Sequence, residues 1–131
     1  MQDEKEKNVL NRDIITMYQG LSQLASNEGM RLPARVSFAV VRNLKMLIPI
    51  IEDIDMARQS IAETYGTLDV DNPTQYRIPE NNWDTVNQEL DAIMETEVDV
   101  PLVKIKMTEI EDLNISIAMA EALMFMVEEE M

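Results

Sequence analysis

Neither cysteine nor histidine occurs in this chain of 131 residues. Without cysteine there are no disulfide bonds, thiolate metal ligands or thiol nucleophiles, and without histidine the commonest base and metal ligand at neutral pH is missing. A Ser-His-Asp site is therefore impossible, and the three glycines form neither a phosphate-binding loop nor a nucleophile elbow. These absences predict a protein that is not an enzyme, with no catalytic residues, no metal and no cofactor.

Basic residues are scarce in the second half of the chain. Residues 65–131 hold three Lys/Arg and sixteen Asp/Glu, whereas residues 1–64 hold eight and nine, and the total charge is −14. Such acidity repels nucleic-acid backbones and anionic membranes, so we expect no direct contact with either. A basic protein partner fits better, although the acidity also has a simpler explanation, which is to keep a methionine-rich chain soluble.

Long apolar runs are also missing. The start, MQDEKEKN, is charged and unlike a secretory signal, and no uncharged run of 18 residues could span a bilayer. We expect a soluble protein that is not secreted. Its length is that of one domain, so we predict a single domain over 1–131 with residues 1–7 flexible.

Helical spacing of apolar residues predicts a first helix in NRDIITMYQGLSQLASNEG. Asn11 is the expected N-cap of this helix, and Gly29 is expected at its C′ position. Gly20 lies inside the pattern, where glycine weakens a helix, and we interpret it as a close crossing with another element.

A second, longer helix is predicted from LPARV to ETYG, and its apolar positions recur every seven residues. Pro49 lies inside it and is expected to kink the helix without breaking it. The short connection to the first helix favours an antiparallel helical hairpin. The heptad row is Val40, Leu47, Ile54 and Ile61. The polar side has the mixed charges of an ordinary solvated surface: Arg42, Lys45, Glu52, Asp55 and Arg58.

Residues 65–83 are predicted to form a β-hairpin insert within the domain, because Leu68 and Val70 face Tyr76 and Ile78 across a turn. Two strands alone are marginal, so support is expected from the strand-like segment VDVPLVKIKM or from a helix. A third helix begins near Trp83. The predicted fold is α+β and mainly helical, with a small sheet and two helices after the hairpin.

The final helix, from Ser116 onward, is apolar nearly all round and rich in methionine. It is either a core helix or an interface for a second chain, because methionine adapts to varied partners. The candidate interface residues are Met119, Leu123, Met124, Met126 and Val127. The acidic end of the helix opposes the helix dipole unless a basic partner meets it. The candidate acidic contacts are Glu109, Glu111, Asp112, Glu128, Glu129 and Glu130.

Asp69, Asp71 and Glu80 match positions 1, 3 and 12 of a calcium-binding loop. Pro73 and Thr74 occupy positions 5 and 6, where position 6 requires glycine, so the pattern disfavours calcium and leaves other cations in the 69–80 loop open. Paired carboxylates later in the chain could hold magnesium for phosphodiester chemistry, but few cationic side chains are present to bind phosphates. A metal-dependent phosphodiesterase therefore ranks last among the hypotheses.

Several segments in order give the chain a family likeness: the helix start at Leu-Pro, ARQSIAETYG, YRIPEN, VDVPLVKI and the acidic C-terminal helix. Over residues 30–129 the chain resembles a family of small tailed-phage proteins of unknown function. The resemblance implies a phage or prophage origin and a location in the host cytoplasm or the virion. It assigns no site residues.

The leading functional hypothesis is a non-catalytic phage accessory protein that acts through protein–protein contacts, as a virion structural or assembly factor or as an adaptor. Its partner would be a component of the particle, a host protein or a second copy in a homo-oligomer. The alternative is an acidic inhibitor of a host nucleic-acid-handling defence protein, such as a CRISPR effector, which imitates phosphate charge.

Overall fold

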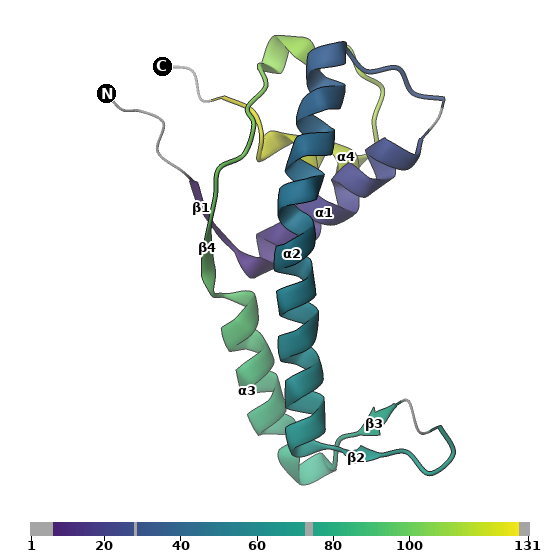
Figure 1. The fold of residues 1–131 in the computed structure, drawn as a ribbon, viewed down its shortest axis with the longest axis vertical. Coiled ribbons are helices and arrows are strands. Elements are labelled where there is room, and N and C mark those ends of the chain that lie inside the picture. The colour runs from purple at the N-terminus through teal and green to yellow at the C-terminus, as the bar shows by residue number, and fades with distance from the viewer. Residues whose placement is uncertain (1–6, 28, 73–74, 129–131) are drawn as a thin grey trace.

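The computed structural model describes residues 7–27, 29–72 and 75–128, and its fold is α+β and mainly helical, as predicted (Figure 1). In chain order the helices and strands are β1 (Lys7–Leu10), α1 (Asn11–Ser26), α2 (Ala34–Tyr65), β2 (Thr67–Leu68), β3 (Tyr76–Arg77), α3 (Trp83–Met94), β4 (Glu97–Val100) and α4 (Ile117–Met124). Two short 3-10 helices, Glu80–Asn82 and Met107–Glu109, lie between them.

The 32-residue helix α2 is the axis of the molecule. At a rise of 1.5 Å per residue it is roughly 48 Å long. Its first half packs in the wide end of the molecule, and its second half forms a narrow stalk with α3 and the β2–β3 hairpin (Figure 1). The helix continues through Pro49, so the prediction of one long helix is confirmed. All four residues of the heptad row are buried: Val40, Leu47, Ile54 and Ile61.

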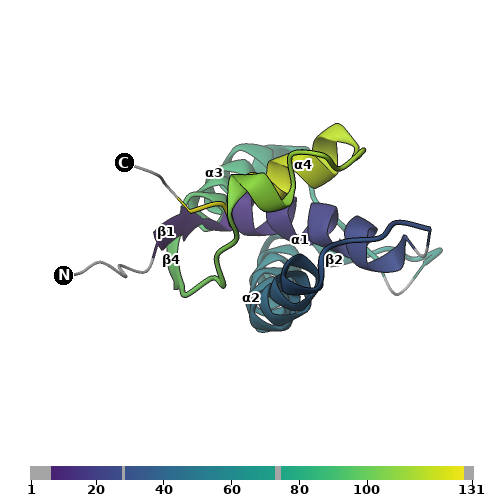
Figure 2. The same cartoon turned by 90° about the horizontal axis from the view of Figure 1, so that it is seen from above.

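Helix α1 is the middle layer of the wide end, between α4 on one side and α2 on the other (Figure 2). It crosses α2 obliquely instead of lying along it as a hairpin partner (Figure 1). Helix α1 packs against α4 as well as α2. The buried residues Ile14, Met17 and Leu21 come from this helix.

Gly20 is the point of closest approach between α1 and α4. A Cβ atom added at Gly20 would overlap the backbone oxygen of Ala118 and the Cβ of Ala122. The prediction of a close crossing is therefore confirmed. Gly29, in contrast, does not have the positive φ of a C′ glycine, and α1 already ends at Ser26.

The strand β1 was not predicted. It pairs antiparallel with β4, with Leu10 opposite Glu97 and Asn8 opposite Asp99. Lys7 thus begins a strand, whereas the rest of the segment predicted to be flexible, residues 1–6, lies outside the described residues. The sequence of β1 lacks the apolar alternation of a strand, and its hydrogen-bonding partner, β4, lies about 90 positions away in the sequence.

Asn11 was predicted to cap α1, but this prediction is wrong, because the N-cap position belongs to Leu10. The Asn11 side chain is buried and donates from Nδ2 to the Ile93 carbonyl at 2.8 Å, at the end of α3. The backbone N–H of Asn11 donates to Thr96 at 2.9 Å. Asn11 therefore ties the start of α1 to the end of α3.

The predicted β-hairpin is present, with Leu68 opposite Tyr76, but β4 does not extend it. The hairpin is instead held at the end of α2, the helix alternative. Gly66 permits this packing, since a Cβ there would lie 2.9 Å from Ile78 Cδ1. Asn82 Nδ2 also donates to the Tyr65 carbonyl at 3.0 Å, which satisfies an end group of α2.

Asn43 connects α2 to the segment that follows β4. It is fully buried, its Nδ2 donates to the Val103 carbonyl at 3.0 Å, and its Oδ1 accepts from the Val103 N–H at 2.8 Å. The side-chain amide thus pairs with the Val103 backbone as a neighbouring strand would. Pro101 and the change of direction after it leave these backbone groups without a β partner, and Asn43 provides one.

The last helix begins as predicted, since Ser116 Oγ accepts from the Met119 N–H at 3.2 Å, but it ends at Met124. Beyond it the backbone pairs with Ile105, which donates to Met126 at 2.9 Å and accepts from Glu128 at 2.8 Å. Glu128 therefore lies outside the helix, which corrects the expectation that it opposes the helix dipole. Glu129 and Glu130 are outside the described residues.

Within the described ranges, no helix combines the length and the apolarity needed to cross a membrane.

Candidate interaction surface

The predicted interface on the last helix is placed mostly in the core. Met119, Leu123 and Met126 are buried, and Val127 is half-buried. Only Met124 is largely accessible, at 52%. In this fold the methionine-rich helix is therefore a packing element, which is the alternative that all-round apolarity ordinarily indicates.

The predicted acidic contacts differ in their availability. Glu109 is half-buried, forms an ion pair with Arg35 (Nε to Oε2, 3.3 Å) and accepts from the Lys106 N–H at 2.8 Å. Glu111, Asp112 and Glu128 are exposed. Glu109 is thus part of the fold, and the three exposed carboxylates remain open to a partner.

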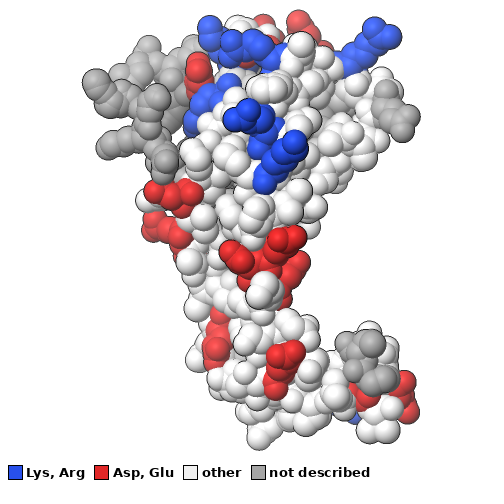
Figure 3. Space-filling view, viewed as in Figure 1, with Lys and Arg blue, Asp and Glu red and all other residues white. Residues whose placement is uncertain are grey.

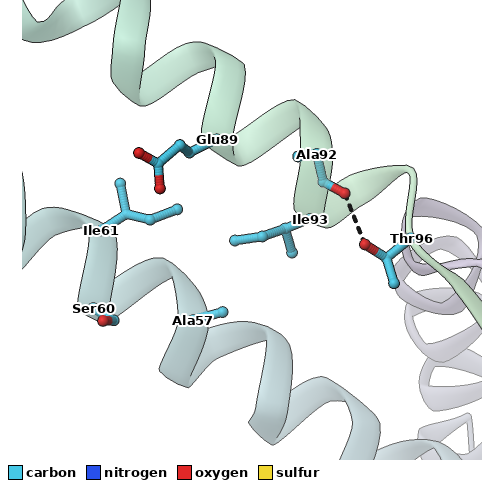
Figure 4. A pocket seen from close by; sticks show the side chains of 7 residues that line it. All are labelled: Ala57, Ser60, Ile61, Glu89, Ala92, Ile93 and Thr96. Carbon is cyan, nitrogen blue, oxygen red and sulfur yellow. Dashed lines mark hydrogen bonds between the residues drawn. The ribbon is translucent and has the colours of Figure 1, made fainter.

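A groove of about 380 Å³ lies between the stalk helices α2 and α3 (Figure 4). Its one carboxylate, Glu89, accepts a hydrogen bond from the Tyr65 hydroxyl, and Thr96 Oγ1 donates to the Ala92 carbonyl at 2.8 Å. The Tyr65–Glu89 bond therefore joins α2 to α3, the Thr96–Ala92 bond is local to the end of α3, and these polar atoms do not converge on an empty centre. The lining residues are Ala57, Ser60, Ile61, Glu89, Ala92, Ile93 and Thr96.

The hydrogen bond to Glu89 raises the pKa of Tyr65, with smaller contributions from burial and from the negative charge of Glu89. The protonated phenol is the form that the fold favours. The contact therefore stabilises the fold below the ordinary tyrosine pKa of about 10 and is lost as pH rises through the raised pKa.

We expect Tyr65→Phe to reduce stability at about pH 8, where the hydrogen bond is intact, and to reduce it less at about pH 11, which is above the ordinary tyrosine pKa of about 10. Urea unfolding of both proteins at the two pH values measures the difference. Tyr76→Phe is the control, because Tyr76 belongs to β3 and not to the contact between α2 and α3. An effect of Tyr65→Phe that is the same at both pH values would contradict the assignment.

The partial calcium-loop pattern has a structural use in the hairpin. Asp69 Oδ1 accepts from the Asp71 N–H at 2.9 Å, and Asp69 N–H donates to Gln75 at 2.9 Å. Pro73 and Thr74 lie outside the described residues. Among residues 7–27, 29–72 and 75–128, no three acidic side chains gather where a metal ion could be held.

The outer surface of α2 carries large apolar side chains that no other described element covers. Phe38 is 61% and Met56 69% exposed, and Val41 and Ile48 are exposed between them. We name this surface the α2 outer face and define it as Phe38, Val41, Arg42, Lys45, Ile48, Pro49, Glu52, Asp55 and Met56, all exposed. It lies opposite the buried heptad row.

The mixed charges on this side of α2 predicted an ordinary solvated surface. The missed signal is that Phe38, Val41, Ile48 and Met56 lie at helical spacing among those charges. Single exposed apolar side chains need no explanation, but four along one face of a helix are typical of a surface that meets a partner.

Charge is separated along the molecule. Figure 3 shows basic side chains over the upper part of α2 and acidic ones over its lower part and the stalk. Residues 7–51 hold six Lys/Arg and two Asp/Glu, whereas residues 52–99 hold two and thirteen. The acidic region therefore begins at Glu52, inside α2.

Phe38 and Arg42 interact at the basic end of the α2 outer face. The Arg42 guanidinium carbon lies 5.5 Å from the centre of the Phe38 ring, a cation–π distance. This contact orients the aromatic ring along the surface of the helix without burying it.

No family model, no curated protein and no solved structure matches this chain. The resemblance to the small tailed-phage proteins therefore stays a prediction.

Proposed function

We propose that this is a non-catalytic protein that acts by binding protein partners through the α2 outer face, as a phage-encoded structural or assembly factor or an adaptor. One observation carries the proposal: Phe38, Val41, Ile48 and Met56 are exposed on one face of one helix. Fully burying a side chain of this size is worth about 1.5–3 kcal/mol, so covering the face with a partner would be favourable in free energy.

The shape of the surface also supports this function. A continuous helix with apolar residues at helical spacing is the form that a helix-binding groove or a second helix recognises. The flanking charges on α2, basic at one end and acidic at the other, would fix the direction in which a partner docks.

The acidic stalk supports the second candidate, an inhibitor of a basic nucleic-acid-handling protein. Residues 52–99 hold thirteen Asp/Glu against two Lys/Arg, so this end of the molecule has the charge that such a protein normally binds. Binding of this kind would depend on charge and would weaken with salt.

One capture experiment tests both candidates. The tagged full chain and a Phe38→Ser/Met56→Ser variant are used to capture partners from cells producing the phage, with Ile117→Ser as control. Ile117 is 82% exposed on α4, so the control removes an equally accessible apolar side chain elsewhere. We expect the double variant to retain partners at least about tenfold less well than the control, because it removes two side chains of about 1.5–3 kcal/mol each.

The salt response separates the candidates. A partner released at about 0.5 M salt, and lost on Glu52→Lys/Asp55→Lys substitution but kept by the Phe38→Ser/Met56→Ser variant, would favour the acidic inhibitor. Partners that the double apolar variant retains as well as the control, whatever the salt, would contradict a role for the α2 outer face.

A further inference from the structure

The α2 outer face is self-complementary about its own midpoint. Counted outward from the peptide bond between Ile48 and Pro49, Lys45 matches Glu52 at equal distance, and Arg42 matches Asp55. Each basic residue on one side thus corresponds to an acidic residue on the other.

Most of the apolar residues follow the same symmetry, but Phe38 does not, because its counterpart at equal distance is the polar Gln59. Ile48 and Pro49 lie at the centre, and Val41 matches Met56 at equal distance from it. All of these side chains are exposed in the structure. Two helices with this pattern, packed antiparallel about a two-fold axis at the centre, would place apolar against apolar and positive against negative along the contact.

We propose that the α2 outer face binds the α2 outer face of a second copy of this chain, antiparallel, with the two-fold axis beside Ile48 and Pro49. This inference rests on the proposed function, since it names a partner for the same face. Such an isologous contact is the commonest kind of symmetric interface.

Charge complementarity selects this partner and this direction. In the antiparallel pair, Lys45 of each copy faces Glu52 of the other near the centre of the contact. Arg42 and Asp55 lie on opposite flanks of the helix, and Asp55 forms an ion pair with Arg58 of its own chain at 3.8 Å, so this second pair contributes only to the long-range attraction between the two ends. A parallel pair would set Lys45 against Lys45 and Glu52 against Glu52, and like charges in contact are unfavourable. The antiparallel arrangement also places the acidic stalk of one copy beside the basic end of the other. This basic end is residues 7–51, which hold six Lys/Arg.

The fold leaves room for this contact. Seen from above, α2 lies at the edge of the molecule, with α1 and α4 both on one side of it (Figure 2). The buried row of α2 faces those helices, so the outer face points away from the rest of the described chain. A contact that uses one helix per copy is at the small end of specific interfaces, so we expect a reversible dimer that forms with increasing concentration.

Charge reversal tests the pairing. Sedimentation equilibrium of the full chain at about 0.15 M salt, where charges beyond about 8 Å are screened, should show a monomer–dimer equilibrium. We expect Lys45→Glu and Glu52→Lys each to weaken the dimer at least about tenfold, because two-fold symmetry turns two attractive pairs into two repulsive ones. An equimolar mixture of the two variants should recover the dimer, since every pair is then again of opposite sign.

Arg31→Glu is the matched control. It makes the same change of charge as Lys45→Glu at an exposed position before α2 and outside the α2 outer face. We expect it to dimerise like the wild type. If Arg31→Glu weakens the dimer as much as Lys45→Glu does, net charge and not the pairing is responsible, which overturns the inference.

Cysteine cross-linking tests the direction and the register, and the chain has no cysteine to interfere. A single Ile48→Cys lies next to its own symmetry mate and should form a disulfide-linked dimer upon oxidation, because disulfides need Cα atoms within about 7 Å. Val41→Cys and Met56→Cys should cross-link with each other in a mixture but not alone. Cross-linking of each alone would indicate a parallel pair and overturn the inference.

The outcomes distinguish this inference from the proposed function. A wild-type chain that stays monomeric up to about 200 μM would overturn self-association, since even weak specific interfaces associate in this range. If the wild-type chain captured another protein and the Phe38→Ser/Met56→Ser variant did not, the proposed function would stand without the dimer. A dimer with the predicted charge and cysteine responses supports both.

Discussion

Asn43→Leu is expected to lower the free energy of unfolding by about 2–4 kcal/mol. The Asn43 amide pairs with both backbone groups of Val103, and its side chain is fully buried. Leucine has nearly the same size but cannot donate or accept, so the Val103 N–H and carbonyl would lose their partners at once. Each unsatisfied buried group costs about 1–3 kcal/mol.

Urea unfolding measures this loss, with the slope of the transition as a check that the unfolded state is unchanged. Asn87→Leu is the control, because Asn87 is exposed on α3 and an exposed helical position changes stability by about 0.5 kcal/mol or less. If Asn43→Leu were as mild as the control, water would have to satisfy Val103, and the link between α2 and residues 101–106 would be unimportant for stability.

Gly20→Ala is expected to destabilise the protein by about 1–3 kcal/mol, against the ordinary gain of about 1 kcal/mol when alanine replaces glycine in a helix. The added methyl group would overlap the Ala118 backbone oxygen and the Ala122 side chain. A backbone oxygen cannot move aside as a flexible side chain does, so α1 and α4 would have to separate. The separation would loosen the buried contacts of Leu21 and Leu123.

Gly29→Ala tests whether the effect comes from the crossing or from glycine itself. Among the residues that the structure describes, a Cβ at Gly29 would meet Asn27 Oδ1 alone, at 3.7 Å, an ordinary contact. Thermal unfolding of both variants should show a clear decrease in Tm for Gly20→Ala and a small change for Gly29→Ala. A Gly20→Ala protein as stable as the wild type would mean that the two helices are not held at this distance.

The location of the candidate site was only partly predictable from the sequence. The apolar run from Ile117 to Val127 indicated burial but not against what, and the fold buries Met119, Leu123 and Met126 in the core. The α2 outer face was hidden in the sequence, because its apolar residues alternate with charges and its midpoint symmetry has meaning only when the helix is known to be unbroken and exposed. Pro49 made an unbroken helix harder to predict than a broken one, because proline in a helix interior removes a backbone hydrogen bond.

By itself the sequence determined the local structure: the long helix with its buried heptad row, the start of α4 at Ser116, the short hairpin and the glycine at a helix crossing. These depend on the spacing and the chemistry of residues near each other in the chain. The tertiary structure alone decided the pairing of β1 with β4, the capture of Val103 by Asn43, the contact of Asn11 with α3 and the shortening of α4 by Ile105. In each of these, a backbone or amide group finds its hydrogen-bond partner 20 or more residues away, and a buried polar group must be satisfied by whatever the fold brings near it.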